Sequence, residues 1–512
     1  MGFFKRTEKE KEDATISPEL RAVLPQHSGS WWTVRHLLLL NLMLLVPSLS
    51  SATIGFDGAM MNGLQTVEQW RGYFNHPKPS ILGVMNAIYP IGKIVGIFPA
   101  AWLSDKYGRK SSMWIGFVLL VLGAGVQGGS INTAMFICSR CLLGAATAFI
   151  AQPAPILVTE LAYPTHRGKI SALYQTFFYF GAIFAAWSTY GTFRLPSTWS
   201  WRIPSILQGA IPFIQFAFFW LVPESPRWLI AHGRNAEARA IFVKYHAGGD
   251  ENSALVNYEM KQIEENLKAE SEALSETSYF DLVRTPANRK RTLIAAIVGF
   301  FAQWNGAGVV SYYITLVLNT IGITKTRDQA LINGLLQVFN WLAAVLAGAL
   351  MVDRIGRRKL FLISTAGMCM AYVIWTALTS HFTRTLDQHA GHAVIFQFTL
   401  RARGVSVTYG TTFIGLIIGQ FVNPIAMSKL GWKYYIVFCC ILFVLFFVIY
   451  FLFPETKGRT LEEIAEIFEG PSASRRVDEE KLGDDNVDDE KRVSRDSSSH
   501  AEVAEVAEEK RA

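Results

Sequence analysis

The sequence has few charged residues for its length. Asp, Glu, Lys and Arg make up 17% of the 512 residues, whereas a soluble globular chain carries about a quarter. Hydrophobic residues make up 51%, and the mean hydropathy is +0.24. The shortage of charge indicates that lipid, rather than water, surrounds most of the chain.

The sequence also lacks the residue groups that catalysis or metal binding requires. It contains no nucleophile–base pair, phosphate-binding loop or set of metal ligands, so we expect neither an enzyme nor a cofactor. All five cysteines fall inside apolar runs, and the CxxC of Cys138 and Cys141 has no second CxxC nearby, so both are expected to fill space in a helix. The net charge of +7 is divided among short clusters between apolar runs, which argues against nucleic acid as a partner.

Long apolar runs are what the sequence has instead. A bilayer core of ~30 Å needs about 20 apolar residues in a helix. Such runs occur at 36–58, 81–102, 112–129, 133–153, 169–191, 203–222, 292–318, 329–351, 360–380, 405–428 and 433–453. We therefore predict an all-α membrane protein.

The longest interruption between runs divides the chain into halves. Its segment 254–274 has the composition of a cytoplasmic helix, and the acidic, serine-rich end of the chain has too few apolar residues to fold alone. The predicted parts are a cytoplasmic tail (1–35), an N-terminal bundle (36–222), a cytoplasmic linker (223–291), a C-terminal bundle (292–453) and a largely disordered cytoplasmic tail (454–512).

Lys and Arg are concentrated in alternate loops. The rich loops carry Lys106, Arg109, Lys110, Arg167, Lys169, Arg234, Arg239, Lys290, Arg291, Arg354, Arg357, Arg358 and Lys359. Because cytoplasmic loops of membrane proteins carry an excess of these residues, we expect the rich loops and both termini in the cytoplasm.

Two motifs occur once in each half. DKYGRK (105–110) follows the second run and returns as DRIGRR (353–358) after the eighth. PESPR (223–227) follows the sixth run and returns as PETKGR (454–459) after the last. Duplication at this spacing is typical of transporters built from paired repeats, with the substrate site between the repeats at mid-membrane.

The second half is short of one span. Only 393–400 is apolar between the ninth and the next run, and eight helical residues cover about 12 Å of the ~30 Å required. One interpretation is a coding exon missing from the sequence, or coding sequence removed as an intron. The other is a genuine eleven-span protein with impaired transport. We favour the first, because losing one helix would open the core and invert everything after it.

Seven motifs stand at the expected membrane ends of the spans. They are GFDGAMMNGLQ (55–65), LSDKYGRK (103–110), SRCLLGA (139–145), TELAYPTHRGK (159–169), PESPRWL (223–229), DRIGRRK (353–359) and PETKGRTLEEI (454–464). In this order, over about residues 36–468, the chain resembles the sugar porters of the major facilitator superfamily, and looks closest to their fungal lactose-permease-like and hexose-transporter branch. The resemblance implies the major facilitator fold, two six-helix bundles with the tenth helix truncated here, and alternating access about a midplane site.

Asp57 places a carboxylate inside the first run, and Arg140, in the fourth, is a natural partner. A buried carboxylate without a partner is costly and tends to hold its proton. The resemblance implies that this pair is the proton-coupling switch, in which protonation of Asp57 frees Arg140. The alternative is a static ion pair that joins two helices.

Amide side chains are the expected sugar contacts, because sugars bind to hydrogen-bonding amides beside an aromatic face. By resemblance these are Gln175, Gln303, Asn340, Gln420 and Asn423, and Asn305, close to Gln303, is a candidate substitute for the amides missing from the family stretch. The segment 302–313 departs from the family pattern QQxxGxN, because Ala302 and Gly308 replace its first glutamine and its asparagine. Hydrogen bonding between helices is the alternative role for each amide.

Charged residues at the cytoplasmic helix ends are the expected gate. By resemblance, salt bridges among them lock the inner side in the outward-facing state; they are Asp105, Arg109, Lys110, Glu160, Arg167, Glu224, Arg227, Asp353, Arg357, Arg358 and Glu455. The alternative, solvated topology signals, does not explain the acids. Tyr312 and Tyr313 correspond to an extracellular gating pair, with anchoring at the lipid interface as the alternative.

The function we expect is import of a mono- or disaccharide with a proton across the plasma membrane. The resemblance and Gly308, which enlarges the pocket, favour a β-linked disaccharide. The partners are the sugar, the proton and the bilayer, and the oligomeric state is open. Two alternatives remain: a sugar sensor with little transport, and an efflux carrier for a secondary metabolite.

Overall fold

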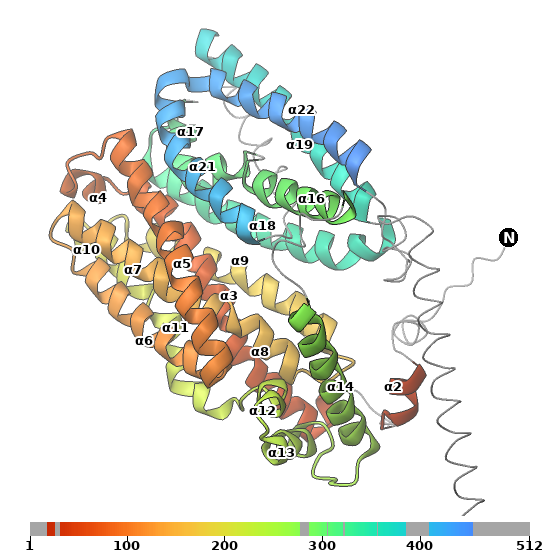
Figure 1. Ribbon diagram of the computed structural model, residues 1–512. Coiled ribbons are helices and arrows are strands. Elements are labelled where there is room, and N and C mark those ends of the chain that lie inside the picture. Colours follow the sequence, from red (N-terminus) through yellow and green to blue (C-terminus); the bar gives the residue numbers. More distant parts are fainter. Residues whose placement is uncertain are drawn as a thin grey trace, which may run out of the picture.

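The computed structural model describes residues 18–25, 31–276, 286–304, 306–320, 323–355, 357–385 and 409–453. Within these ranges the secondary structure is helical, without strands. Figure 1 shows the helices in two groups, one from each half of the chain. The all-α prediction is confirmed.

The first half contains six helical spans. They are α3 (Arg35–Thr66), α5 (Pro79–Tyr107), α6 (Arg109–Gly128), α7 (Thr133–Ala151) continued by α8 (Pro153–Leu161), α9 (Arg167–Thr192), and α10 (Trp199–Leu207) continued by α11 (Ala210–Phe218). Each span is long and apolar enough to cross a membrane. The short α4 (Glu68–Tyr73) follows the first of them. The six apolar runs of this half lie on these helices.

The second half contains α16 (Pro286–Gln303), α17 (Ala307–Thr320), α18 (Thr326–Ile355), α19 (Arg357–Thr385), α21 (Tyr409–Leu430) and α22 (Tyr434–Leu452). Phe361–Ser380 and Leu416–Leu452 have the length and composition of membrane spans, and the second of these covers both α21 and α22. The predicted runs of this half fall on these helices, apart from 304–306 between α16 and α17, residues 433 and 453 at the ends of α22, and 405–408. The predicted truncation of the tenth span concerns residues 386–408, which lie outside the described part of the chain.

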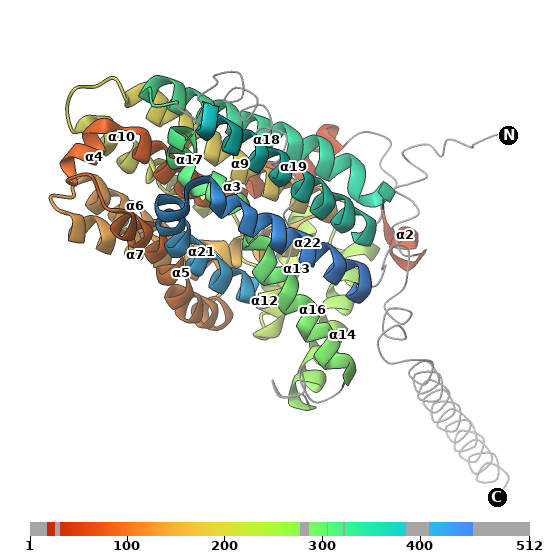
Figure 2. The ribbon, with the colours of Figure 1, turned by 90° about the horizontal axis from the view of Figure 1, so that it is seen from above.

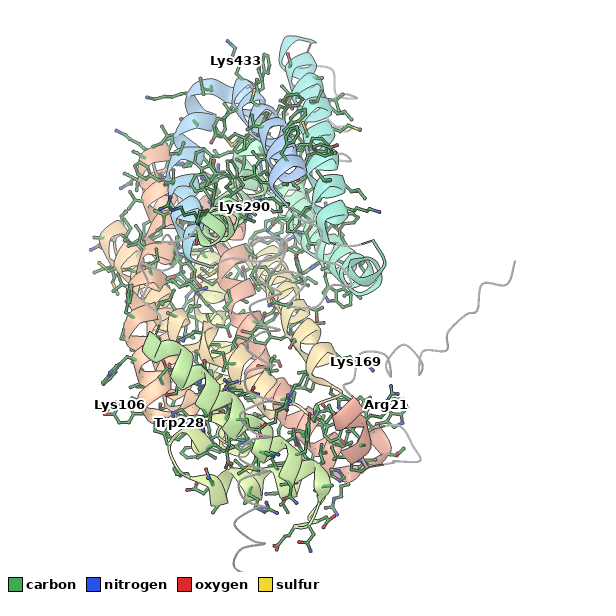
Figure 3. All side chains as sticks on the ribbon, turned by 45° about the vertical axis from the view of Figure 1, so that its right-hand side comes forward. Arg21, Lys106, Lys169, Trp228, Lys290 and Lys433 are labelled. Carbon is green, nitrogen blue, oxygen red and sulfur yellow. The ribbon has the colours of Figure 1, made fainter. Side chains whose placement is uncertain are left out.

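The linker forms three helices at one end of the first half (Figure 1). They are α12 (Pro226–Ala231), α13 (Asn235–Tyr245) and α14 (Ala254–Glu276), and α14 covers the helix predicted at 254–274. Trp228 of α12 donates from Nε1 to the carbonyl oxygen of Asp105 at 2.7 Å, which joins the linker to the end of α5. Figure 3 shows Trp228 and Lys106 at this end and Lys433 at the opposite end. We call them the linker end and the far end.

Glycines allow the helices of the first half to pack with their backbones in close contact. A Cβ on Gly55 of α3 would lie 1.8 Å from the carbonyl oxygen of Phe178 in α9, and one on Gly144 of α7 would lie 2.0 Å from that of Tyr89 in α5. Only glycine permits such approaches. They bring Asp57, two residues after Gly55, and Arg140, one turn before Gly144, into the same interior.

The two halves meet along α5 with α21 and α9 with α18 (Figures 1 and 2). A Cβ on Gly83 of α5 would lie 3.0 Å from the carbonyl oxygen of Phe421, and one on Gly334 of α18 would lie 3.4 Å from the ring of Trp187. Tyr313 of α17 is buried in a cluster that includes Leu64 of α3. These three contacts lie toward the far end, so the halves are closely packed there.

Candidate functional site

The centre of the first half holds a buried ion pair. Arg140 Nη1 of α7 donates to Asp57 Oδ1 of α3 at 2.5 Å, and the side chains are 4% and 1% exposed. Gln208, at the end of α10, donates from Nε2 to the same oxygen at 2.6 Å. The structure thus brings together the two residues expected to pair, about two turns or more from the nearest ends of their helices.

The surroundings of this pair leave part of it unsatisfied. The Arg140 guanidinium lies over the ring of Tyr89 at 4.9 Å, and the Tyr89 hydroxyl donates to Thr147 Oγ1 at 3.1 Å. Within the described part of the chain, Asp57 Oδ2 and Arg140 Nε have no hydrogen-bond partner. An unsatisfied buried polar atom is costly, so the pair as it stands is not fully stabilised. Sequence reasoning missed Gln208 and Tyr89, because neither carries a charge.

The side chain of Gln175 on α9 is exposed, and the surrounding residues show which way it faces. It lies nine residues from Phe184, which is about 180° around the helix. Phe184 and Phe180 are exposed on the apolar outer face, while Ala182 and Ala186 are buried on the face of Gln175. Gln175 therefore lies on the face of α9 that is turned toward the other helices, and its side chain is exposed.

Gln303 stands at a break between α16 and α17. α16 ends at Gln303 and α17 begins at Ala307, and Gly306 between them has φ +83°, a conformation that favours glycine. Gln303 is half-buried, and the side chain of Trp304 stacks on Phe300 with ring centroids 5.6 Å apart. A broken helix at mid-span is typical of transporter substrate sites. Asn305 lies outside the described residues.

Asn340 belongs to a polar stripe on α18. Asn333, Gln337 and Asn340 are spaced i, i+4, i+7 and share one face. Asn333 and Gln337 are buried, and among the described residues the Oδ1 atoms of Asn333 and Asn340 have no hydrogen-bond partner. Leu342, exposed, lies about 180° from Asn333. The stripe therefore faces inward with free acceptors. Its spacing was readable from the sequence, although only Asn340 was predicted.

Gln420 and Asn423 of α21 contact tyrosines of neighbouring helices. The Tyr313 hydroxyl is in hydrogen-bond contact with the main-chain oxygen of Gln420 and with its Oε1, the latter at 3.2 Å. Asn423 Oδ1 accepts from the Tyr434 hydroxyl at 2.8 Å. Hydrogen bonding between helices, the alternative role of these amides, is thus present for both. The side chain of Tyr312 is not described.

Five of the expected gating residues, including Lys110, gather at the linker end. Arg109 Nη1 is 2.7 Å from Asp105 Oδ1, and Arg109 Nε is 3.6 Å from Glu160 Oε2. Glu224 accepts from the backbone N–H groups of Arg109 and Lys110, each at 3.1 Å, and so caps the start of α6. Burial raises the pKa of Glu224, although these hydrogen bonds oppose the rise.

The remaining gating residues do not join this group. Arg167 pairs with Glu259 at 3.4 Å and Arg227 pairs with Glu270 at 2.7 Å, and both acids belong to the linker helix α14. The sequence analysis placed Arg167 and Arg227 among the gating residues and did not consider α14. The side chains of Asp353, Arg357 and Arg358, and the whole of Glu455, lie outside the described residues.

Comparison with known proteins gives a family. The family model described as "Sugar (and other) transporter" matches residues 43–400 and 392–468. The MFS-type transporter criB of Aspergillus cristatus is 28% identical over 440 residues, which cover 83% of this chain and 92% of the relative. The high-affinity glucose transporter of Kluyveromyces lactis is 28% identical over 470 residues, covering 83% and 84%.

Solved structures share the fold. The inward open conformation of the xylose transporter XylE from E. coli has a TM-score of 0.64 at 21% identity, covering 84% of this chain and 100% of that chain. The proton:xylose symporter XylE bound to 6-bromo-6-deoxy-D-glucose has a TM-score of 0.62 at 22% identity, covering 84% and 99%. The chain therefore has the major facilitator fold.

Proposed function

The chain belongs to the sugar transporter family, whose members are multi-pass membrane transporters rather than enzymes, and we propose that it imports a mono- or disaccharide together with a proton. Two similar proteins support this cargo: one is a glucose transporter and the other a proton:xylose symporter. The observation that carries the proposal is the buried contact of Asp57 with Arg140.

Proton coupling follows from the chemistry of this pair. With Asp57 ionised, Arg140 and Gln208 are both held by one carboxylate oxygen. Protonation of Asp57 removes the charge that attracts Arg140, so α3 and α7 lose a strong contact and the bundle can change its packing. A proton bound here thus favours one of two conformations, which is the requirement for symport.

In this proposal the sugar site lies between the two halves of the chain. The bundles 36–222 and 292–453 move relative to each other around it. Gln175 offers an amide from the first half. Gln303 at the helix break and Asn340 with its free acceptor offer amides from the second. Further candidates for sugar contact are Asn305, Gln420 and Asn423. To bind sugar, Gln420 and Asn423 would have to break their hydrogen bonds with Tyr313 and Tyr434.

The proposed orientation puts the linker end and both termini in the cytoplasm of a plasma-membrane protein. Close packing at the far end then corresponds to an inward-facing state. In the outward-facing state, we expect Asp105, Arg109, Glu160 and Glu224, together with Arg167 and Arg227, to close the inner side against Asp353, Arg357 and Glu455. Tyr312 and Tyr313 then belong to the outer gate.

Uptake measurements test the proposal. The chain is expressed in yeast that lack hexose and disaccharide transporters, and labelled glucose, xylose and lactose are supplied at external pH 5 and pH 7. We expect uptake of at least one sugar against its gradient, higher at pH 5 and abolished by a protonophore. Uptake that only equilibrates the sugar, unaffected by the protonophore, would contradict symport.

A further inference from the structure

A buried histidine and a buried carboxylate join the linker to the end of the fourth span. His246 directly follows α13 and Glu259 lies on α14, and their side chains are 1% and 2% exposed. His246 Nδ1 is 2.7 Å from Glu259 Oε2. His246 Nε2 is 3.2 Å from the main-chain oxygen of Leu161, the last residue of α8. Both ring nitrogens of His246 therefore face oxygen atoms.

These two contacts need one proton more than a neutral histidine and an ionised carboxylate have between them. A carbonyl oxygen can only accept, so His246 Nε2 must donate to Leu161. A hydrogen bond between Nδ1 and Glu259 then requires a second proton, carried either by the imidazole or by the carboxyl group. In both forms the pair is neutral overall, and the proton belongs to the pair rather than to one residue. Loss of this proton leaves two acceptors facing each other in a buried site, which is costly.

Two of the groups around His246 keep their charge state near neutral pH. The ring of Tyr163 packs on that of His246 with centroids 5.4 Å apart. Burial, and after it the charge of Glu259, raises the pKa of Tyr163 to about 12, so its hydroxyl stays protonated. Arg167 Nη2 is 3.4 Å from Glu259 Oε1, and a guanidinium stays charged throughout. Neither group can therefore be the one that responds to pH in this range.

Two other histidines lie close to this contact. His166, in the turn between α8 and α9, packs on the ring of Tyr163 with centroids 5.5 Å apart. His36 of α3 lies beside Gly248, since a Cβ on Gly248 would be 2.8 Å from His36 Nδ1. Histidine side chains titrate near neutral pH, so a variant that retains both of them is needed to identify the group that responds.

We infer that the proton shared by His246 and Glu259 is a pH-sensitive latch that fastens α13 and α14 to the first half of the chain. The docked pair holds this proton, whereas a histidine released into water gives it up near neutral pH. Docking of the linker is therefore tightest at low pH and loosens as the pH rises. The inference holds whatever the chain transports. Under the proposed orientation, the latch responds to the pH of the cytoplasm.

Hydrogen exchange at several pH values tests the latch. The purified full chain in lipid nanodiscs is followed by mass spectrometry at pH 5.5, 6.5, 7.5 and 8.5. Exchange rates are converted to protection factors, which removes the intrinsic pH dependence of amide exchange. Loss of one proton can change the docking equilibrium by up to about tenfold per pH unit. In wild type, the protection of α13 and α14 should fall at least tenfold between pH 5.5 and pH 8.5.

Glu259→Gln separates the proton from the hydrogen bonds. The amide can donate to Nδ1 while a neutral His246 donates from Nε2 to Leu161, and the amide oxygen can still accept from Arg167. All contacts then form without the extra proton, so protection should stay high at all four pH values. His246→Phe keeps a ring but no hydrogen bond, and protection should be low throughout. Glu265→Gln removes an exposed carboxylate of the same helix and should show the same fall as wild type.

Wild-type protection that does not change with pH overturns the latch. A fall that persists in Glu259→Gln overturns it as well, because His166 and His36 are retained in that variant and one of them then causes the fall. If Glu259→Gln does not fold, His166→Gln and His36→Gln decide. The fall must persist in both of these variants, and its loss in either one assigns the pH response to that histidine and contradicts the latch.

Discussion

Arg140 donates to Asp57 at 2.5 Å across α7 and α3, in a site where both side chains are almost fully buried. An ion pair at this depth has lost its hydration, so removing one partner leaves an uncompensated charge. The same property makes the pair responsive to a single proton. Under the proposed function, this pair is where a protonation would change helix packing.

Gln175→Ala and Gln303→Ala test the sugar contacts. Each change removes one amide from an inward-facing position, and a lost hydrogen bond of about 1–1.5 kcal/mol raises the KM for sugar roughly tenfold. Initial rates of labelled-sugar uptake measure the change. Gln69→Ala, on the exposed α4, is the control and should leave the KM unchanged. Two variants with wild-type KM values would remove these amides from the sugar site.

Gly108→Ala tests the turn between α5 and α6. Gly108 has φ +98° and ψ 161°, and a Cβ there would lie 2.4 Å from Glu224 Oε2. Strain of this kind costs ~1–3 kcal/mol, so the thermal stability of the purified protein should fall. Gly168→Ala is the matched control, because a Cβ there meets nothing within 4 Å. Equal melting temperatures for both variants would show that the turn tolerates a side chain.

Glu224→Gln tests the buried cap of α6 by its pH dependence. Burial raises the pKa of Glu224 above its ordinary value of 4.5. The folded chain thus holds this proton more tightly than the unfolded chain, and the stability that Glu224 contributes is fully present below its ordinary pKa and is lost as the pH rises through the raised one. Between about pH 4 and about pH 7, the Tm of wild type should fall relative to that of Glu224→Gln. A relative rise would mean that the hydrogen bonds to Glu224 outweigh its burial.

The transcript across codons 393–401 tests the missing span. The family match itself comes in two segments that overlap at residues 392–400, where the apolar sequence is too short. We expect the transcript to carry additional codons for about 20 mostly apolar residues at this place. A transcript that reads as the present sequence would establish a chain with eleven apolar runs.

Asp57 and Arg140 were predicted from the sequence because they are charged. Their uncharged neighbours Gln208 and Tyr89 were not predicted. Asp57 and Arg140 are lone charges in apolar runs, so sequence alone locates them and suggests their contact. Gln208 gave no signal, because an amide in an apolar run has many possible partners.

The fold followed from the lengths of the apolar runs, whereas contacts with the linker did not. Arg167 and Arg227 pair with acids of α14, an amphipathic helix whose position depends on how it packs under the bundle. The polar stripe of α18 could have been found, because Asn333, Gln337 and Asn340 repeat at helical spacing.

Counterflow and concentrative uptake of Asp57→Asn test the coupling mechanism most directly. The amide keeps the shape of the carboxyl group but carries no charge and cannot take up a proton in this pH range. We expect concentrative uptake in proteoliposomes with an inward proton gradient to fall at least tenfold and to lose its pH dependence, while exchange of labelled for unlabelled sugar continues. Glu68→Gln, at the exposed far end, should behave as wild type. Concentrative, pH-dependent uptake that survives in Asp57→Asn would contradict a proton switch at Asp57.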